Sequence, residues 1–92
     1  MGRVQDQVAV ITGAAKGLGE AIALRLAAEG AKVILGDIDG SGLASVANAV
    51  REAGADVVTV VGDITEEEPA AQLIESAIEH FGQIDILVNN VG

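Results

Sequence analysis

The 92-residue chain has no cysteine, tryptophan or tyrosine, and Phe81 is its only aromatic residue. Without cysteine, disulfides and thiolate metal sites are excluded. Half of the residues are hydrophobic, so a packed core is possible, but it must be built from valine, isoleucine, leucine and alanine. A chain of this length forms one domain at most, and we expect a single unit over residues 1–92.

Basic residues are also scarce, since 5 Lys and Arg stand against 14 Asp and Glu, for a formal net charge of −9. Nucleic acids and anionic membrane surfaces attract clustered Lys and Arg, so neither is expected as a partner. The chain contains no long apolar run of the kind found in signal peptides or membrane spans. We therefore expect a cytoplasmic protein.

What the chain does contain is a repeated pattern of helix end, glycine and apolar run, as in "AAEGAKVILGD" and "REAGADVVTVVGD". Gly30, Gly54 and Gly82 occupy the position where a helix commonly ends in a left-handed residue. Short, nearly continuous apolar runs are typical of strands buried on both faces of a parallel sheet. Four such runs are predicted as strands: Val8–Thr12, Lys32–Leu35, Val57–Val61 and Ile84–Val88.

Helical spacing of apolar residues fills the intervals between these strands. The apolar positions are Leu18, Ile22 and Leu26; then Leu43, Val46, Ala47 and Val50; then Ile74, Ala77, Ile78 and Phe81. Thr65 and Glu68 fit a capping box at the start of the third helix, with Pro69 in its first turn. The order βαβαβαβ predicts an α/β fold of three layers, in which helices cover a parallel four-stranded sheet.

The stretch "ITGAAKGLGEAIA" joins the first strand to the first helix. Its glycines, Gly13, Gly17 and Gly19, permit a tight turn and a close approach of the backbone to a ligand. The helix N-terminus that follows offers N–H groups and a partial positive charge to a diphosphate. Glycines also serve ordinary turns, but this position favours dinucleotide binding.

Asp37 ends the second predicted strand, 18 residues beyond Gly19. An acidic residue at about this spacing hydrogen-bonds the adenosine ribose in dinucleotide-binding folds. Its carboxylate would accept from the ribose hydroxyls and repel a 2′-phosphate, so NAD is favoured over NADP. The alternative is an ordinary turn in "DIDGSG". Lys16 could instead meet a 2′-phosphate or be a solvated loop residue, and Asp37 carries the greater weight.

Asp63 stands at the equivalent end of the third strand in "VVGDIT". Because the carboxyl ends of parallel strands share one edge of the sheet, its carboxylate could accept from an adenine amino group. The alternative is a turn residue just before Thr65. His80 has no second histidine to share a metal, so we expect a structural role and no metal site.

Taken together, these segments resemble the short-chain dehydrogenase/reductase family. The matching motifs are "TGAAKGLG", Asp37, the pair Asp63–Ile64, and "NNVG" at 89–92, in which Val91 replaces the family's alanine. The resemblance covers essentially the whole chain. It implies a Rossmann fold with strand order 3-2-1-4 and an NAD(P)-dependent oxidoreductase acting on an alcohol or carbonyl.

The resemblance also implies roles for particular residues. The glycine-rich turn would cradle the diphosphate, Asp37 and Ile38 would flank the adenosine ribose, and Asp63 and Ile64 would surround the adenine. Asn90 would lie near the nicotinamide-side ribose, while Asn89 would tie strand ends together. The implied cofactor-binding residues are Gly13, Ala15, Lys16, Gly17, Leu18, Gly19, Asp37, Ile38, Asp63, Ile64 and Asn90.

The family's catalytic serine and Tyr-x-x-x-Lys pair lie beyond the asparagine motif, and this chain has no tyrosine. No catalytic residue is therefore predicted, and the chain alone is expected to be inactive. The favoured interpretation is the NAD-binding half of a dehydrogenase whose catalytic and substrate half is absent. The alternatives are a stand-alone half-Rossmann module without redox chemistry and a remnant without a ligand. Exposure of the fourth strand at 84–88 predicts self-association.

Overall fold

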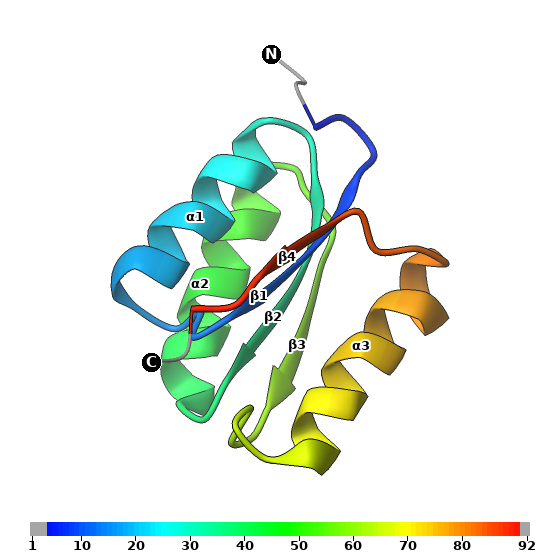
Figure 1. The fold of residues 1–92 in the computed structure, drawn as a ribbon. Coiled ribbons are helices and arrows are strands. Elements are labelled where there is room, and N and C mark those ends of the chain that lie inside the picture. The colour runs from blue at the N-terminus through cyan, green and yellow to red at the C-terminus, as the bar shows by residue number, and fades with distance from the viewer. Residues whose placement is uncertain (1–3, 91–92) are drawn as a thin grey trace.

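The structure is a computed structural model that describes residues 4–90; Val91 and Gly92 of the "NNVG" motif lie outside these residues. Strands and helices alternate along the whole described chain, as the sequence predicts (Figure 1). The elements are β1 (Val8–Thr12), α1 (Gly17–Ala28), β2 (Lys32–Asp37), α2 (Gly40–Glu52), β3 (Val57–Val61), α3 (Glu67–Phe81) and β4 (Ile86–Val88).

The four strands form one parallel sheet in the order β3-β2-β1-β4. This confirms the predicted fold class and strand order of a Rossmann-type half. The last strand is shorter than the predicted run at 84–88. The Val8 N–H donates to the Asp85 side-chain carboxylate at 2.8 Å. Pairing of β1 with β4 therefore starts only at Ile86.

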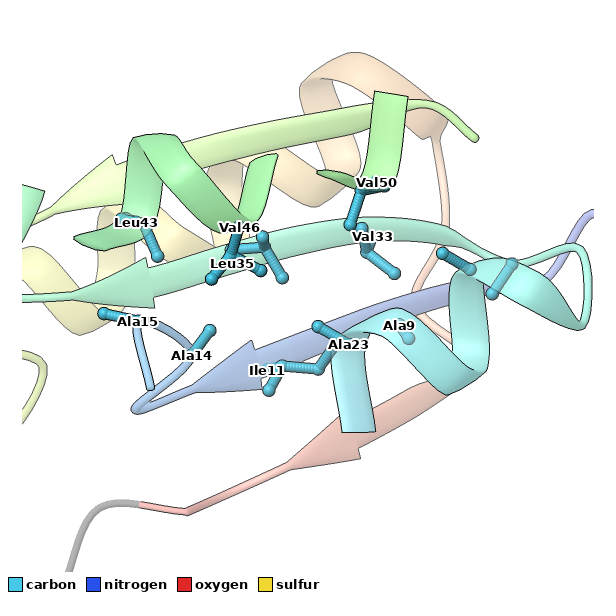
Figure 2. Packing of buried hydrophobic residues seen from close by; sticks show 12 residues of the cluster. Ala9, Ile11, Ala14, Ala15, Ala23, Val33, Leu35, Leu43, Val46 and Val50 are labelled. Carbon is cyan, nitrogen blue, oxygen red and sulfur yellow. The ribbon is translucent and has the colours of Figure 1, made fainter. Parts of the chain in front are cut away.

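Helices cover both faces of the sheet, α1 and α2 on one face and α3 on the other (Figure 1). Successive β1 residues therefore point into different cores. Ile11 packs with Leu35 and Val46 under α1 and α2 (Figure 2), whereas Val10 packs with Leu73 under α3. Every β1 residue is buried, which explains why the strand sequences do not alternate between polar and apolar.

The buried face of α1 differs from the one that its leucine spacing predicts. Gly19, Ala23 and Ala27 are buried, while Leu18 is 66% exposed. Small residues allow this helix to lie close to the sheet, because a Cβ on Gly19 would overlap the carbonyl oxygen of Gly13. The predicted spacing therefore identified the helix. Of the three predicted residues Leu26 packs partly against the core, but the most buried side lies one residue further along.

The buried face of α3 confirms part of the prediction, since Ala77 is buried and Phe81 packs against the same core, but it does not include the two isoleucines. Leu73 and Ala77 are buried, whereas Ile74 and Ile78 are exposed at 39% and 52%. Leu73 lies over Gly36 of β2, where an added Cβ would come within 3.0 Å of both leucine methyl groups. The missing side chain in β2 thus provides the space that Leu73 fills.

The predicted helix ends are confirmed. Gly30, Gly54 and Gly82 follow α1, α2 and α3 with φ of 98°, 90° and 77°. The apolar face predicted for α2 is also confirmed, since its four predicted core residues are all buried. Across residues 4–90, none of the helices has the length and apolar character that crossing a membrane requires.

Candidate functional site

A groove of about 400 Å³ lies at the edge of the sheet where the strands end. Each strand contributes residues at its carboxyl end or in the turn after it, which is where ligands bind in open α/β sheets. The lining residues are Gly13, Lys16, Gly17, Asp37, Ile38, Asp63, Ile64 and Asn90. The fold therefore brings together eight of the eleven residues predicted from the sequence; Ala15, Leu18 and Gly19 do not line this groove.

The turn between β1 and α1 requires its glycines for different reasons. Gly13 and Gly17 have φ of 62° and 63°, in the left-handed region that side chains disfavour. A Cβ on Gly13 would also lie 2.7 Å from the carbonyl oxygen of Asn90. Gly19 instead permits contact between α1 and the turn. The turn is therefore both tight and closely packed against the end of β4.

The N-terminus of α1 opens on this turn. Within residues 4–90, no side chain caps the first turn of α1, and Lys16 at the N-cap position is extended. The first N–H groups of a helix have no partner inside it, and they carry its partial positive charge. Because Lys16 and Gly17 both line the groove, an anion in the groove could accept from these groups.

Asp37 makes two hydrogen bonds with its carboxylate. The N–H of Ala15 donates to Oδ2 at 3.0 Å, and the N–H of Asp39 donates to Oδ1 at 2.9 Å. The side chain is half-buried, whereas its neighbour Ile38 is 70% exposed. The sequence gives no sign of the bond to Ala15, because the two residues are 22 positions apart.

Asp39 is the N-cap of α2. Its Oδ1 accepts from the Gly42 N–H at 3.0 Å and from the Ser41 hydroxyl at 3.2 Å. These bonds, and then the positive charge of Lys16, hold the pKa of the Asp39 carboxyl below its usual value. The positive charge of Lys16 therefore also acts on a carboxylate at the start of α2.

Asp63 lines the groove and also forms a turn with Thr65. Its Oδ1 accepts from the Thr65 hydroxyl at 2.5 Å and from the Thr65 N–H at 3.0 Å. The hydroxyl bond, followed by the backbone bond, lowers the pKa of the Asp63 carboxyl. The predicted capping box at Thr65 is wrong, because α3 starts at Glu67 with Glu66 as its N-cap. The Thr65 side chain is turned back to Asp63 instead.

Thr12 joins the ends of β1 and β4. Its hydroxyl lies 3.3 Å from both the Val88 carbonyl oxygen and Asn89 Oδ1, and it accepts from the Asn90 N–H at 2.8 Å. Asn90 Nδ2 donates to the Gly13 carbonyl oxygen at 3.4 Å. The expected tie through Asn89 is confirmed. Sequence patterns missed Thr12, although a buried polar residue ending an apolar strand is a signal for such a bond.

His80 is not among the residues that line the groove. His80 Nδ1 lies 2.9 Å from the Ser76 carbonyl oxygen on the exposed side of α3. In the part of the chain from 4 to 90, no group of three or more His, Asp or Glu residues could hold a metal ion. The groove is lined by the backbone of the glycine-rich turn, the side chain of Lys16, two carboxylates, an amide and two isoleucines.

A family model described as short chain dehydrogenase matches residues 7–92. The chain is 48% identical over 92 residues to an uncharacterized oxidoreductase of Mycobacterium tuberculosis, covering all of this chain and 35% of that protein. It is 43% identical over 89 residues to 1-deoxy-11-beta-hydroxypentalenate dehydrogenase of Streptomyces avermitilis, covering 97% of this chain and 33% of that enzyme. The chain therefore spans about a third of the length of these relatives.

Solved structures of similar proteins have the same fold. Carveol dehydrogenase from Mycobacterium avium, in complex with NAD, has a TM-score of 0.93 and 36% identity, covering 100% of this chain and 38% of that one. L-Sorbose reductase from Gluconobacter frateurii, complexed with NADPH and L-sorbose, has a TM-score of 0.93 and 39% identity. That match covers 97% of this chain and 34% of the reductase.

Proposed function

The chain belongs to the short-chain dehydrogenase family, and on that premise we propose that residues 1–92 form the NAD-binding half of an oxidoreductase. One observation carries the proposal. The uncapped N-terminus of α1, with its glycine-rich turn, lies in the same groove as the half-buried carboxylate of Asp37. Diphosphate and ribose are the two chemical groups that such a pair would recognise.

The described residues fit a dinucleotide along the groove. The first N–H groups of α1, beginning with that of Gly17 in the groove, would meet the diphosphate, which approaches over the glycines of the turn. Leu18 and Gly19 follow directly in the first turn of the helix. Asp37 and Ile38 would bind the adenosine ribose. Further along, Asp63 and Ile64 would contact the adenine, and Asn90 would lie at the nicotinamide-side ribose. Gly13, Ala15 and Lys16 complete the proposed set by shaping the turn.

NAD is proposed over NADP because of Asp37. A carboxylate at the ribose accepts from a diol, and it repels the negative charge of a 2′-phosphate. Lys16 would favour that phosphate, but its charge also acts on the Asp39 carboxyl at the start of α2. One similar structure contains NAD and another NADPH, so the preference rests on the carboxylate of this chain.

The proposed role of this chain is binding and orientation. When bound, a nicotinamide dinucleotide supplies the hydride acceptor or donor for interconversion of an alcohol and a carbonyl. The sequence has no tyrosine that could hand over the accompanying proton. We therefore expect no turnover by residues 1–92 alone, and hydride transfer only in a chain that also carries the catalytic residues. The cytoplasmic location remains a prediction.

Self-association of the 92-residue chain is the second part of the proposal. β4 is an edge strand of the described sheet, and Leu87 on it is 60% exposed. An unpaired edge with apolar side chains favours pairing with another strand. A second copy of the chain is the proposed occupant of this edge.

Calorimetric titration of the chain with NAD and NADP tests the proposal. We expect NAD to bind more tightly, and Asp37→Ala to weaken NAD binding by roughly 1.5–3 kcal/mol through loss of charge-assisted hydrogen bonds. Asp56→Ala is the matched control, since Asp56 is an exposed carboxylate at the opposite edge of the sheet. Tighter NADP binding would contradict the NAD preference. Absence of heat with either nucleotide would contradict the function.

A further inference from the structure

The first part of the glycine-rich turn is hydrogen-bonded to β2, and the second part is exposed. The Ala14 N–H donates to the Gly36 carbonyl oxygen at 3.2 Å, and the Ala15 N–H donates to the Asp37 carboxylate at 3.0 Å. Both alanines are buried, whereas the next three residues, at 16–18, are exposed. The hydrogen bonds between β2 and the turn therefore end at Ala15, directly before the N-terminus of α1.

The same carboxylate also connects this turn to the start of α2. Asp37 Oδ1 accepts from the Asp39 N–H, and Asp39 in turn caps α2 through the Gly42 N–H. The two regions are in close contact, because a Cβ on Gly42 would lie 3.1 Å from the Cβ of Ala15. One side chain thus joins the turn before α1 to the N-cap of α2.

Removing this carboxylate would leave the buried Ala15 N–H without its acceptor. A buried donor without a partner is unfavourable, so the turn would move until water or another group reached it. The Ala14 bond to Gly36 uses only backbone atoms and would remain. The movement would then be concentrated at Ala15 and the residues that follow it, which include the first N–H groups of α1.

We propose that Asp37 positions the glycine-rich turn for the diphosphate, in addition to its contact with the ribose. This inference rests on the proposed function. The two roles are compatible, since each carboxylate oxygen has two lone pairs and uses one of them here. If the turn is in the binding conformation for only a fraction of the time, its apparent Kd for the ligand is the intrinsic Kd divided by that fraction.

The first experiment uses no nucleotide and measures amide hydrogen exchange by NMR. Asp37→Ala is expected to speed exchange at Ala15 by roughly tenfold or more while leaving Ala14 protected. Asp56→Ala should change neither amide. Unchanged exchange at Ala15 would overturn the inference. Loss of protection at Val10 in the core would mean that Asp37→Ala unfolds as a whole. In that case the wild-type chain is measured instead, and absence of a scalar coupling across its Ala15–Asp37 hydrogen bond overturns the inference.

The second experiment separates the two roles of Asp37 by removing the ribose hydroxyls. The probe is an NAD analogue whose adenosine is 2′,3′-dideoxy, titrated beside NAD. Asp37→Ala is expected to weaken binding of the analogue by roughly tenfold, and Asp37→Asn, which keeps one acceptor oxygen, to restore most of it. If Asp37→Ala binds the analogue as the wild type does but binds NAD more weakly, Asp37 acts on the ribose alone and the inference fails. If the wild type does not bind NAD, the proposed function fails, while the exchange measurement still tests the hydrogen bond.

Discussion

Replacing Gly19 with alanine sets helix propensity against packing. Gly19 lies in the first turn of α1, and at a position that alanine can adopt without strain, alanine is favoured over glycine by about 0.4–1 kcal/mol. The new Cβ, however, would overlap the Gly13 carbonyl oxygen and lie 2.9 Å from Asn90 Nδ2. Neither neighbour can move easily, because Gly13 is backbone in a tight turn and Asn90 Nδ2 donates to its carbonyl oxygen. We therefore expect packing to decide the outcome.

The net effect can be estimated from these two terms. Inserting a methyl group into a packed site is unfavourable by about 1–3 kcal/mol, and a rigid backbone neighbour argues for the upper end. After the gain in helix propensity, about 2 kcal/mol of stability would be lost. For a domain of this size each kcal/mol changes Tm by roughly 4–8 °C, so a fall of roughly 8–16 °C is expected.

Thermal and urea unfolding of Gly19→Ala, followed by far-UV circular dichroism, would measure this loss in a chain that has no tryptophan. The matched control is Gly40→Ala, at the first residue of α2. Its Cβ would meet only the Val61 methyl groups, at 3.5 and 3.6 Å. Gly40→Ala should raise stability by about 0.4–1 kcal/mol. If Gly19→Ala is as stable as Gly40→Ala, the close contact between α1 and the turn does not require glycine at position 19.

Three further outcomes are expected. Thr12→Val removes the hydroxyl that accepts from the Asn90 N–H, and should lower the free energy of unfolding by about 1–3 kcal/mol in urea; Thr12→Ser is the control that should keep most of it. Asp39 and Asp63 have folded pKa values below the ordinary value of 3.8, so their contribution to stability is complete above about pH 4 and is lost as the pH falls through the folded pKa. The stability gap between the wild type and Asp63→Asn should therefore narrow as the pH falls from 6 towards 3 in urea titrations, and a constant gap would contradict this. Sedimentation velocity should show association that increases with concentration and that Leu87→Lys reduces, whereas a monomer at every concentration would rule out pairing through β4.

Local patterns predicted the elements well, because they depend on neighbouring residues. The bounds of β1 and β3, the glycines after each helix and the apolar face of α2 all follow from short-range spacing. β2 instead extends two residues beyond the predicted run at 32–35, and β4 starts two residues later than the predicted run at 84–88. The packing faces of α1 and α3 did not follow from spacing, since similar apolar residues stand one position apart on each helix. The packing face of α1 is decided by Gly19, which faces the turn. The packing face of α3 is decided by Gly36, which lies opposite Leu73. Gly36 hints at the choice on α3, because a glycine within a strand often marks a close approach of another group.

The groove could be predicted in part for a similar reason. A parallel sheet collects its strand ends at one edge, so Asp37, Asp63 and Asn90 were expected to lie together. The hydrogen bonds that hold them were not, because they join Ala15 to Asp37 and Asn90 to Thr12 across 22 and 78 positions. No local pattern encodes such pairs, and the roles of these residues towards a nucleotide remain predictions.

The pairing of β1 with β4 also has a consequence for the order of folding. Ala9 pairs with Ile86, so the groove is completed by a contact between distant parts of the chain. Closing such a long loop is entropically unfavourable, and we expect β4 to dock after β1 and β2 have formed. Its three paired residues would also be the first to open in the native state. A nucleotide held by Asn90 would then slow the release of this strand, linking ligand occupancy to the lifetime of the folded sheet.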